Sequence, residues 1–118
     1  MTTVRGIIEA YQKEVQEKPD LDVPRAAIIL NHLASLVGNC NSEIRTRKTT
    51  YNIKKRDIFF ADADKKATTA KILSEATDEW NLLQEALDTK ELTVELMRSL
   101  KYYLRSHNEW EAAGNMRV

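Results

Sequence analysis

Between residues 41 and 87 the chain contains neither glycine nor proline, the two residues that most often interrupt regular secondary structure. The whole sequence has only three Gly and two Pro. So few turn-forming residues predict few, long elements, and helices rather than strands. Taken as one helix, this segment would be roughly 70 Å long at about 1.5 Å per residue. A compact domain of this size has a radius of gyration of about 13 Å, so such a helix must project beyond it.

Two shorter helices are expected before the long one. Apolar residues from Val4 to Val15 recur at the i, i+3, i+4, i+7 and i+11 spacing of an amphipathic helix. A second helix is expected to start near Asp22, with Pro24 in its first turn. Gly38 is well placed as the C-terminal stop of that helix.

A further helix is expected after the long one. Residues 88–91 resemble a capping box and predict a break there. The apolar stripe of this last helix is Leu92, Leu96, Leu100, Tyr103, His107 and Trp110.

Helix two would then fold back on the front half of the long helix, with Ile28 opposite Tyr51. The last helix would cover the back half, with Leu100 in the core opposite Ala76. These patterns predict one all-α domain over residues 1–118, a long central helix with flanking helices folded back as antiparallel hairpins.

Composition limits the classes of function. Eighteen basic and eighteen acidic residues cancel, so no global field attracts the chain to nucleic acid or to an anionic membrane. The single cysteine, Cys40, cannot form an internal disulfide and indicates a reducing compartment. No apolar run approaches the length of a membrane span, and the N-terminal segment lacks the apolar core of a signal peptide. We therefore expect a soluble, cytoplasmic protein.

One local departure from this balance is a basic segment. Residues 44–56 contain six basic residues and no acidic one. On a helix, Ile44, Tyr51 and Ile58 form an apolar seam, and most of the basic side chains flank it. The favoured interpretation is a solvated rim whose long cationic stems cover the seam. An acidic protein partner and nucleic acid are the alternatives. Nucleic acid is disfavoured because backbone binding needs cations gathered on one exposed face, with aromatic platforms for single strands.

Candidate chemistry is sparse. Asp57, Asp62 and Asp64 are acidic, but on a helix Asp62 and Asp64 diverge by about 200°, which favours a solvated face over a metal site. Cys40 and His32 are the only conceivable nucleophile–base pair, and nothing in the sequence orients them. We expect no catalytic, cofactor-binding or metal-binding residues, and a protein that is not an enzyme.

The carboxyl-terminal half also carries a resemblance. Tyr51 and Arg56, the Ala/Lys-rich segment "KATTAKILSEA" and the Leu/Arg/Ser-rich helix around residues 96–106 resemble small phage-encoded all-helical accessory proteins. The resemblance covers about 60 residues of the chain. It implies an all-helical hairpin and an accessory role, often near replication or recombination, in the cytoplasm of a bacterial host. It carries over no catalytic residues.

These observations predict a non-enzymatic helical interaction or adaptor protein. Ile53 and Phe60 are seven residues apart on a face outside the seam, and Phe59, Leu73, Trp80 and Leu87 continue at multiples of seven. We expect this face to pair with a second copy, giving a homodimer that also binds another protein. The alternative is a nucleic-acid-associated accessory factor that uses the basic segment. The candidate interaction residues are Arg45, Arg47, Lys48, Ile53, Lys54, Lys55, Arg56, Phe59 and Phe60.

Overall fold

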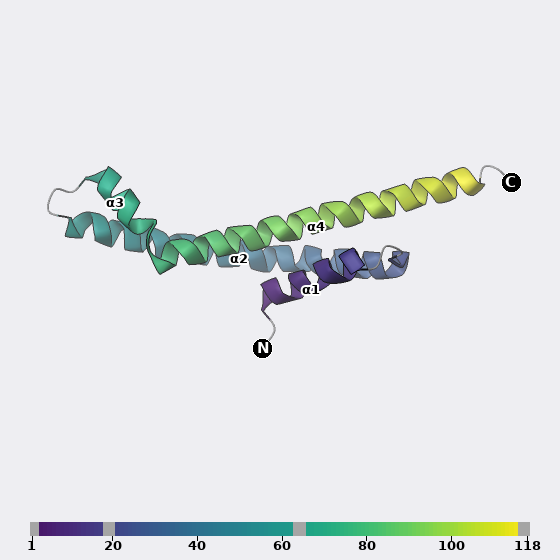
Figure 1. The fold of residues 1–118 in the computed structure, drawn as a ribbon, viewed down its shortest axis with the longest axis horizontal. Coiled ribbons are helices and arrows are strands. Elements are labelled where there is room, and N and C mark those ends of the chain that lie inside the picture. The colour runs from purple at the N-terminus through teal and green to yellow at the C-terminus, as the bar shows by residue number, and fades with distance from the viewer. Residues whose placement is uncertain (1–2, 18–20, 63–65, 116–118) are drawn as a thin grey trace. The chain divides into compact units, whose positions relative to one another are not determined.

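The protein is all-α. The computed structural model describes residues 3–17, 21–62 and 66–115, with side chains described as far as Asn108. Within these residues the elements are α1 (Val4–Glu17), α2 (Val23–Ala61), α3 (Ala67–Ser74) and α4 (Asp78–Asn115) (Figure 1). They form two compact units, the first made of residues 1–38 and 91–118 and the second of residues 39–90. Each unit therefore contains one part of α2 and an antiparallel part of α4.

In the first unit, α1 packs against the beginning of α2 (Figure 1). The hydroxyl group of Tyr11 hydrogen-bonds the imidazole Nδ1 of His32, and the two rings meet edge to face with centroids 5.5 Å apart. Arg25 donates two hydrogen bonds to Glu14, at 2.8 and 2.9 Å. These hydrogen bonds raise the pKa of Arg25 above its usual value. A bidentate guanidinium–carboxylate pair fixes orientation as well as contact, so it sets how α1 lies on α2.

The part of α4 in the first unit is also bound to the start of α2. The hydroxyl group of Tyr103 donates to the backbone carbonyl of Leu21, two residues before α2 begins. The core of this unit is apolar and comes from all three helices and the segment before α2. Its buried side chains are Ile8, Leu21, Ala26, Ile29, Leu33, Leu36, Leu96 and Leu100.

In the second unit, α3 and the beginning of α4 pack against the end of α2. Tyr51 is the centre of this packing, because its ring lies 5.0 Å from the ring of Trp80 in α4 and its hydroxyl lies 3.2 Å from that of Ser74 in α3. Cys40, Ala70, Leu83 and Ala86 are also buried here. The predicted seam is confirmed in part, since Tyr51 is buried and Ile44 and Ile58 are half-buried.

The predicted end of the second helix at Gly38 is wrong. Gly38 is an interior residue of α2, which runs without a break from Val23 to Ala61. Helical Gly costs about 0.5–1 kcal/mol relative to Ala. Apolar residues on both sides, Leu36 and Cys40, are buried and hold the helix through that position. Because α2 does not turn back, Ile28 does not lie opposite Tyr51, and it is exposed instead.

Residues 41–87 do not form one continuous helix, and the first break lies close to Phe60, where the sequence leaves a bend open. The helical segment is interrupted after Ala61 and again between Ser74 and Asp78. At the first interruption, the backbone N–H of Lys66 donates to Oδ2 of Asp62 at 3.3 Å, and Lys66 has an extended backbone at φ −90° and ψ 121°. An aspartate side chain that bonds nearby backbone in this way competes with the helix, so the chain leaves the helix without Gly or Pro.

The last helix begins ten residues earlier than its capping-box signal predicts, at Asp78 rather than Asp88. Thr77 supplies the cap, because its hydroxyl accepts a hydrogen bond from the N–H of Trp80 at 3.3 Å.

Leu100 is confirmed as core with 1% of its surface exposed, but its predicted neighbour Ala76 is exposed. The side chain of Trp110 lies outside the described side chains.

Candidate interaction surfaces

All nine predicted interaction residues lie on α2 and belong to the second unit. Their basic members differ in what they contact. Arg47 is half-buried and its Nε lies 2.7 Å from Oε1 of Glu43, one turn earlier. Arg56 lies 4.0 Å from Asp57. Surface ion pairs between residues that are close in sequence contribute little to the stability of the fold. Their main effect is to neutralise part of the positive charge of this surface.

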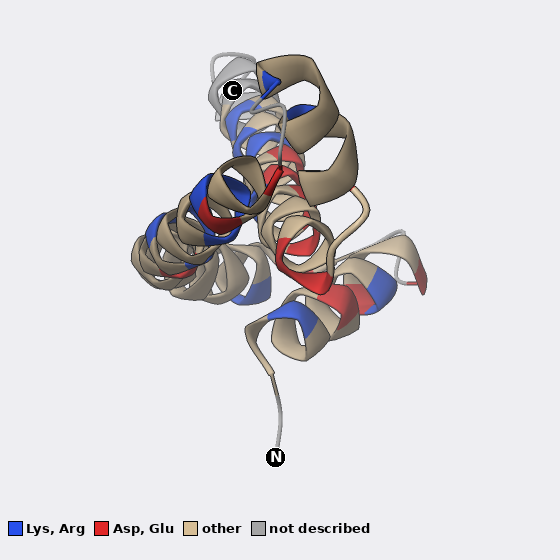
Figure 2. Cartoon of the chain, turned by 90° about the vertical axis from the view of Figure 1, so that its left-hand side faces the viewer, with Lys and Arg blue, Asp and Glu red and all other residues tan. Residues whose placement is uncertain are grey.

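The remaining cations of the basic segment are Arg45, Lys48, Lys54 and Lys55, and no ion pair within the described part of the chain engages them. Arg45, Lys48 and Lys55 are separated from Asn52 by seven, four and three residues, which places them on one side of α2. Lys54 follows Arg47 by seven residues on another side. The Lys and Arg positions of α2 and α3 are blue in Figure 2.

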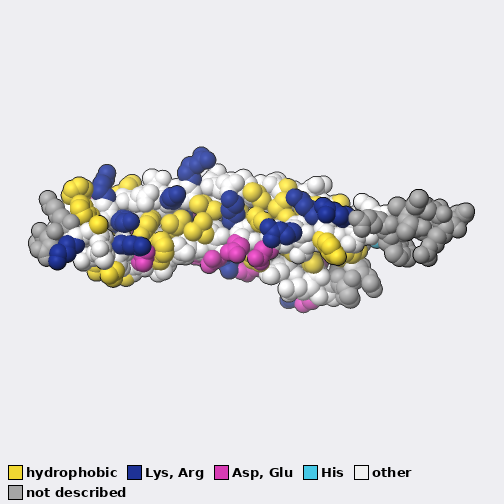
Figure 3. Space-filling model, turned by 90° about the horizontal axis from the view of Figure 1, so that it is seen from above, with side chains coloured by type: hydrophobic (Ala, Val, Ile, Leu, Met, Phe, Trp, Pro, Cys, Tyr) yellow, Lys and Arg dark blue, Asp and Glu magenta, His cyan; other side chains and the backbone are white. Residues whose placement is uncertain are grey.

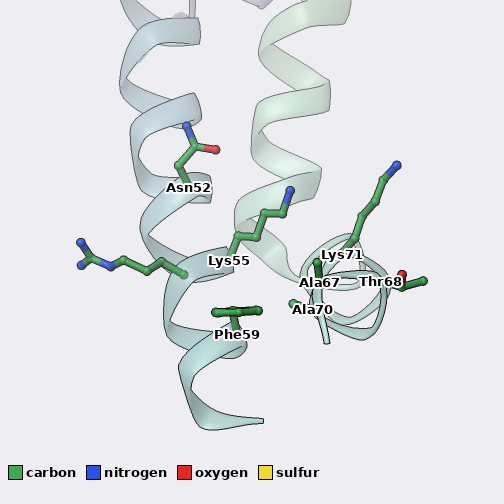
Figure 4. A pocket seen from close by; sticks show the side chains of 8 residues that line it. Asn52, Lys55, Phe59, Ala67, Thr68, Ala70 and Lys71 are labelled. Atoms are coloured by element: carbon green, nitrogen blue, oxygen red, sulfur yellow. The ribbon is translucent and has the colours of Figure 1, made fainter. Parts of the chain in front are cut away.

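A groove of about 620 Å³ lies between α2 and α3. Each helix contributes four lining residues: Asn52, Lys55, Arg56 and Phe59 from α2, and Ala67, Thr68, Ala70 and Lys71 from α3. Figure 4 shows the ring of Phe59 between the two helices, near Ala70 of α3. The side chains of Lys55 and Lys71 extend to the same side of that ring (Figure 4). The groove therefore combines an apolar floor with cationic side chains.

Exposed apolar side chains are the second feature of this unit. Among the described residues, six of the eight large hydrophobic side chains that are exposed belong to it: Ile53, Phe60, Ile72, Leu73, Leu82 and Leu87. Ile53 is 47% and Phe60 is 62% exposed. Figure 3 shows hydrophobic side chains interspersed with Lys and Arg on one face of the molecule. Apolar groups of this size in contact with water are typical of interaction surfaces.

The predicted heptad register along one long helix is wrong. Leu73 belongs to α3, and Trp80 and Leu87 belong to α4, so they do not continue the face of α2. Phe59 and Phe60 have different environments, although their rings meet edge to face with centroids 5.4 Å apart. Phe59 is half-buried in the groove, whereas Phe60 faces solvent.

The other residues that the sequence offers as candidates for chemistry are His32, Cys40 and the aspartates. His32 bonds Tyr11 in the first unit, whereas Cys40 is buried in the second. Asp62 accepts the hydrogen bond from Lys66, and Asp64 lies outside the described residues. Within the described ranges, no three His, Cys, Asp or Glu side chains come close enough to share a metal ion. Among the same residues, none of the helices has the length and apolar character needed to cross a membrane.

Sequence reasoning missed the half of the groove that α3 supplies. Lys71, Thr68, Ala67 and Ala70 were not predicted as site residues, because α3 was expected to continue the long helix. The signal that marks the interruption is Asp62, four residues before the N–H that it accepts. Asn52 was missed as well, although its spacing from Lys48, Lys55 and Phe59 places it on the same side of α2.

Comparison of the chain with protein-family models, with curated proteins and with solved structures found no match.

Proposed function

We propose that this chain is a non-enzymatic helical interaction protein that pairs with a second copy of itself and binds another protein, as an accessory factor of a phage in the bacterial cytoplasm. The observation that carries the proposal is the concentration of exposed large hydrophobic side chains in the second unit. Ile53 and Phe60 are separated by two turns on one side of α2. A stripe of this kind is buried when it meets the same stripe of a second copy around a twofold axis.

The test is the mass of the protein in solution. Light scattering coupled to size-exclusion chromatography at micromolar concentration should give twice the chain mass of 13.6 kDa. Ile53→Lys and Phe60→Lys should each shift the mass toward 13.6 kDa, because a buried lysine at the interface is costly. The control is Ile28→Lys, at a residue of similar exposure in the first unit, which should leave the dimer intact. A wild-type mass of one chain at every concentration contradicts self-pairing.

The second candidate function is a nucleic-acid-associated accessory factor for replication or recombination. It is favoured by the common side of α2 shared by Arg45, Lys48 and Lys55, since phosphate binding needs cations gathered in this way. Its test is the binding of a single-stranded oligonucleotide across a range of salt concentrations. Contacts to phosphates give a steep, linear loss of log affinity with log salt. A flat salt dependence, or no binding at low salt, contradicts this function.

A further inference from the structure

The groove between α2 and α3 has a regular construction. Its α2 residues, Asn52, Lys55, Arg56 and Phe59, follow the i, i+3, i+4, i+7 spacing that places side chains on one side of a helix. Arg45 and Lys48 extend this side by two further turns toward the N-terminus, and both are exposed. At about 1.5 Å per residue, the side from Arg45 to Phe59 is roughly 21 Å long. It can therefore contact several residues of a partner.

The charged side chains described on this surface are all cationic. Among the described residues that line the groove, three are cations, Lys55, Arg56 and Lys71, and none is acidic. Lys55 and Lys71 make no ion pair with any described residue. Figure 4 shows both side chains extending past Phe59 to the same side. A ligand that supplies negative charge on this side of the ring can therefore pair with both ammonium groups.

The floor of the groove is apolar. Phe59 from α2 lies between the helices, and Ala67 and Ala70 contribute the small side chains of α3. Phe59 is half-buried and Ala70 is buried, so packing fixes the position of the floor. Thr68 and Asn52 add hydrogen-bonding groups at the edge. A ligand that matches the groove presents an apolar side chain to the floor and carboxylates to the rim.

We propose that this groove binds an acidic peptide segment of a partner protein. An aliphatic side chain of that segment lies on Phe59, between the helices, and its carboxylates pair with Lys55 and Lys71. Further acidic residues reach Lys48 and Arg45 along α2. This inference rests on the proposed interaction function, to which it adds the chemistry of the second partner and the residues that select it.

Nucleic acid fits the same surface less well. Single-strand binding proteins stack successive bases on successive aromatic side chains, and Phe59 is the single aromatic side chain among the described residues that line the groove. The rest of its floor is alanine, which suits an aliphatic side chain. The chain as a whole carries no net charge, so long-range attraction to a polyanion is weak. An acidic peptide needs only the local charge that the groove supplies.

The experiment uses the full chain and a fluorescein-labelled peptide of repeated Glu-Glu-Leu-Ala units, followed by fluorescence anisotropy. The wild-type protein should bind it, and a peptide in which Lys replaces each Glu should not bind. Lys71→Glu and Lys55→Glu should each weaken binding by at least about tenfold. The matched control is Lys54→Glu, which changes an exposed lysine on another side of α2 and should leave the affinity within about twofold.

A second variant separates binding from folding. Thr68→Glu places a negative charge in the groove at an exposed position of α3 and should weaken peptide binding with the helical circular dichroism unchanged. Peptide binding that is equal in Lys71→Glu, Thr68→Glu and Lys54→Glu overturns the groove assignment. Absence of peptide binding, with tight binding of an oligothymidine strand, overturns it in favour of nucleic acid. Light scattering on the same samples keeps the two proposals apart, because a wild-type protein that is dimeric but does not bind the peptide contradicts this inference alone.

Discussion

The phenol oxygen of Tyr51 lies 3.2 Å from the hydroxyl oxygen of Ser74, and this contact joins α2 to α3 inside the second unit. The Ser74 hydroxyl in turn donates to the backbone carbonyl of Lys71 at 3.0 Å, so Tyr51 is the donor to Ser74. Both side chains are buried. The relay fixes α3 beside the part of α2 that forms the other wall of the groove.

Replacement of Ser74 by alanine is expected to destabilise the fold, because it leaves the buried Tyr51 hydroxyl without its acceptor. The cost of such an unpaired group is about 1–3 kcal/mol. Tyr51→Phe removes the donor itself and should cost about 0.5–1.5 kcal/mol. The loss of stability in the double variant should be smaller than the sum of the two single losses, since Tyr51→Phe removes the hydroxyl that Ser74→Ala leaves without a partner. Urea denaturation of the four proteins measures this, and strict additivity would show that the two hydroxyls do not interact.

Leu100→Ala should destabilise the first unit strongly. Leu100 is 1% exposed in a core that it shares with helices α1 and α2. Truncation of a buried leucine leaves a cavity and costs about 2–5 kcal/mol. The control is Tyr102→Ala, two residues further along α4, where the side chain is 71% exposed and the expected change is within about 0.5 kcal/mol. Equal effects of the two substitutions in thermal or urea denaturation would place Leu100 at the surface.

The all-α class and the burial of Leu100 could be predicted because they depend on composition and on helical periodicity, which are local properties. The same periodicity predicted α1, where Ile8 is buried and Val4, Ile7, Tyr11 and Val15 are half-buried. Helix ends were harder. Gly38 looks like a stop, but tertiary burial on both sides of it outweighs the small cost of one helical glycine.

The sequence predicted only the α2 side of the groove, for a related reason. The α2 residues lie on consecutive turns of one helix, so their spacing in the sequence places them on one side of it. The α3 residues reach the groove because α2 ends at Ala61 and α3 is a separate helix, and the side chain of Asp62 bonds the backbone N–H of Lys66 without a Gly or Pro. A break of this kind depends on geometry that residue types alone do not specify. Once it is missed, Lys71 and Thr68 are assigned to the wrong place.

Gly38→Ala should stabilise the protein. Gly38 lies inside α2, and a methyl group built on its Cα would meet no atom within 4 Å. Alanine then reduces the conformational freedom of the unfolded chain without a clash, worth about 0.5–1 kcal/mol. The converse control is Ala34→Gly at an exposed position one turn earlier, which should lose a similar amount. A destabilised Gly38→Ala variant in thermal denaturation would mean that α2 requires the glycine at this position.

Thr77→Ala should weaken the start of α4. The Thr77 hydroxyl accepts from the backbone N–H of Trp80 at 3.3 Å and donates to the carbonyl of Ser74 at 2.6 Å, so it caps α4 and closes the turn after α3 together. Loss of an N-cap hydroxyl typically costs about 1 kcal/mol, within a range of about 0.5–2 kcal/mol. Thr77→Ser keeps the hydroxyl and should retain most of the stability.

The matched control for this cap is Thr69→Ala, at an exposed threonine in the interior of α3. Its effect on the free energy of unfolding in urea should stay within about 0.5 kcal/mol. Because Trp80 packs on Tyr51, a frayed start of α4 would also loosen that contact, and the fluorescence of the variant's tryptophans should shift toward the solvent-exposed spectrum. A Thr77→Ala variant as stable as Thr77→Ser, with unshifted fluorescence, would show that the first turn of α4 is held by Trp80 packing and not by the cap.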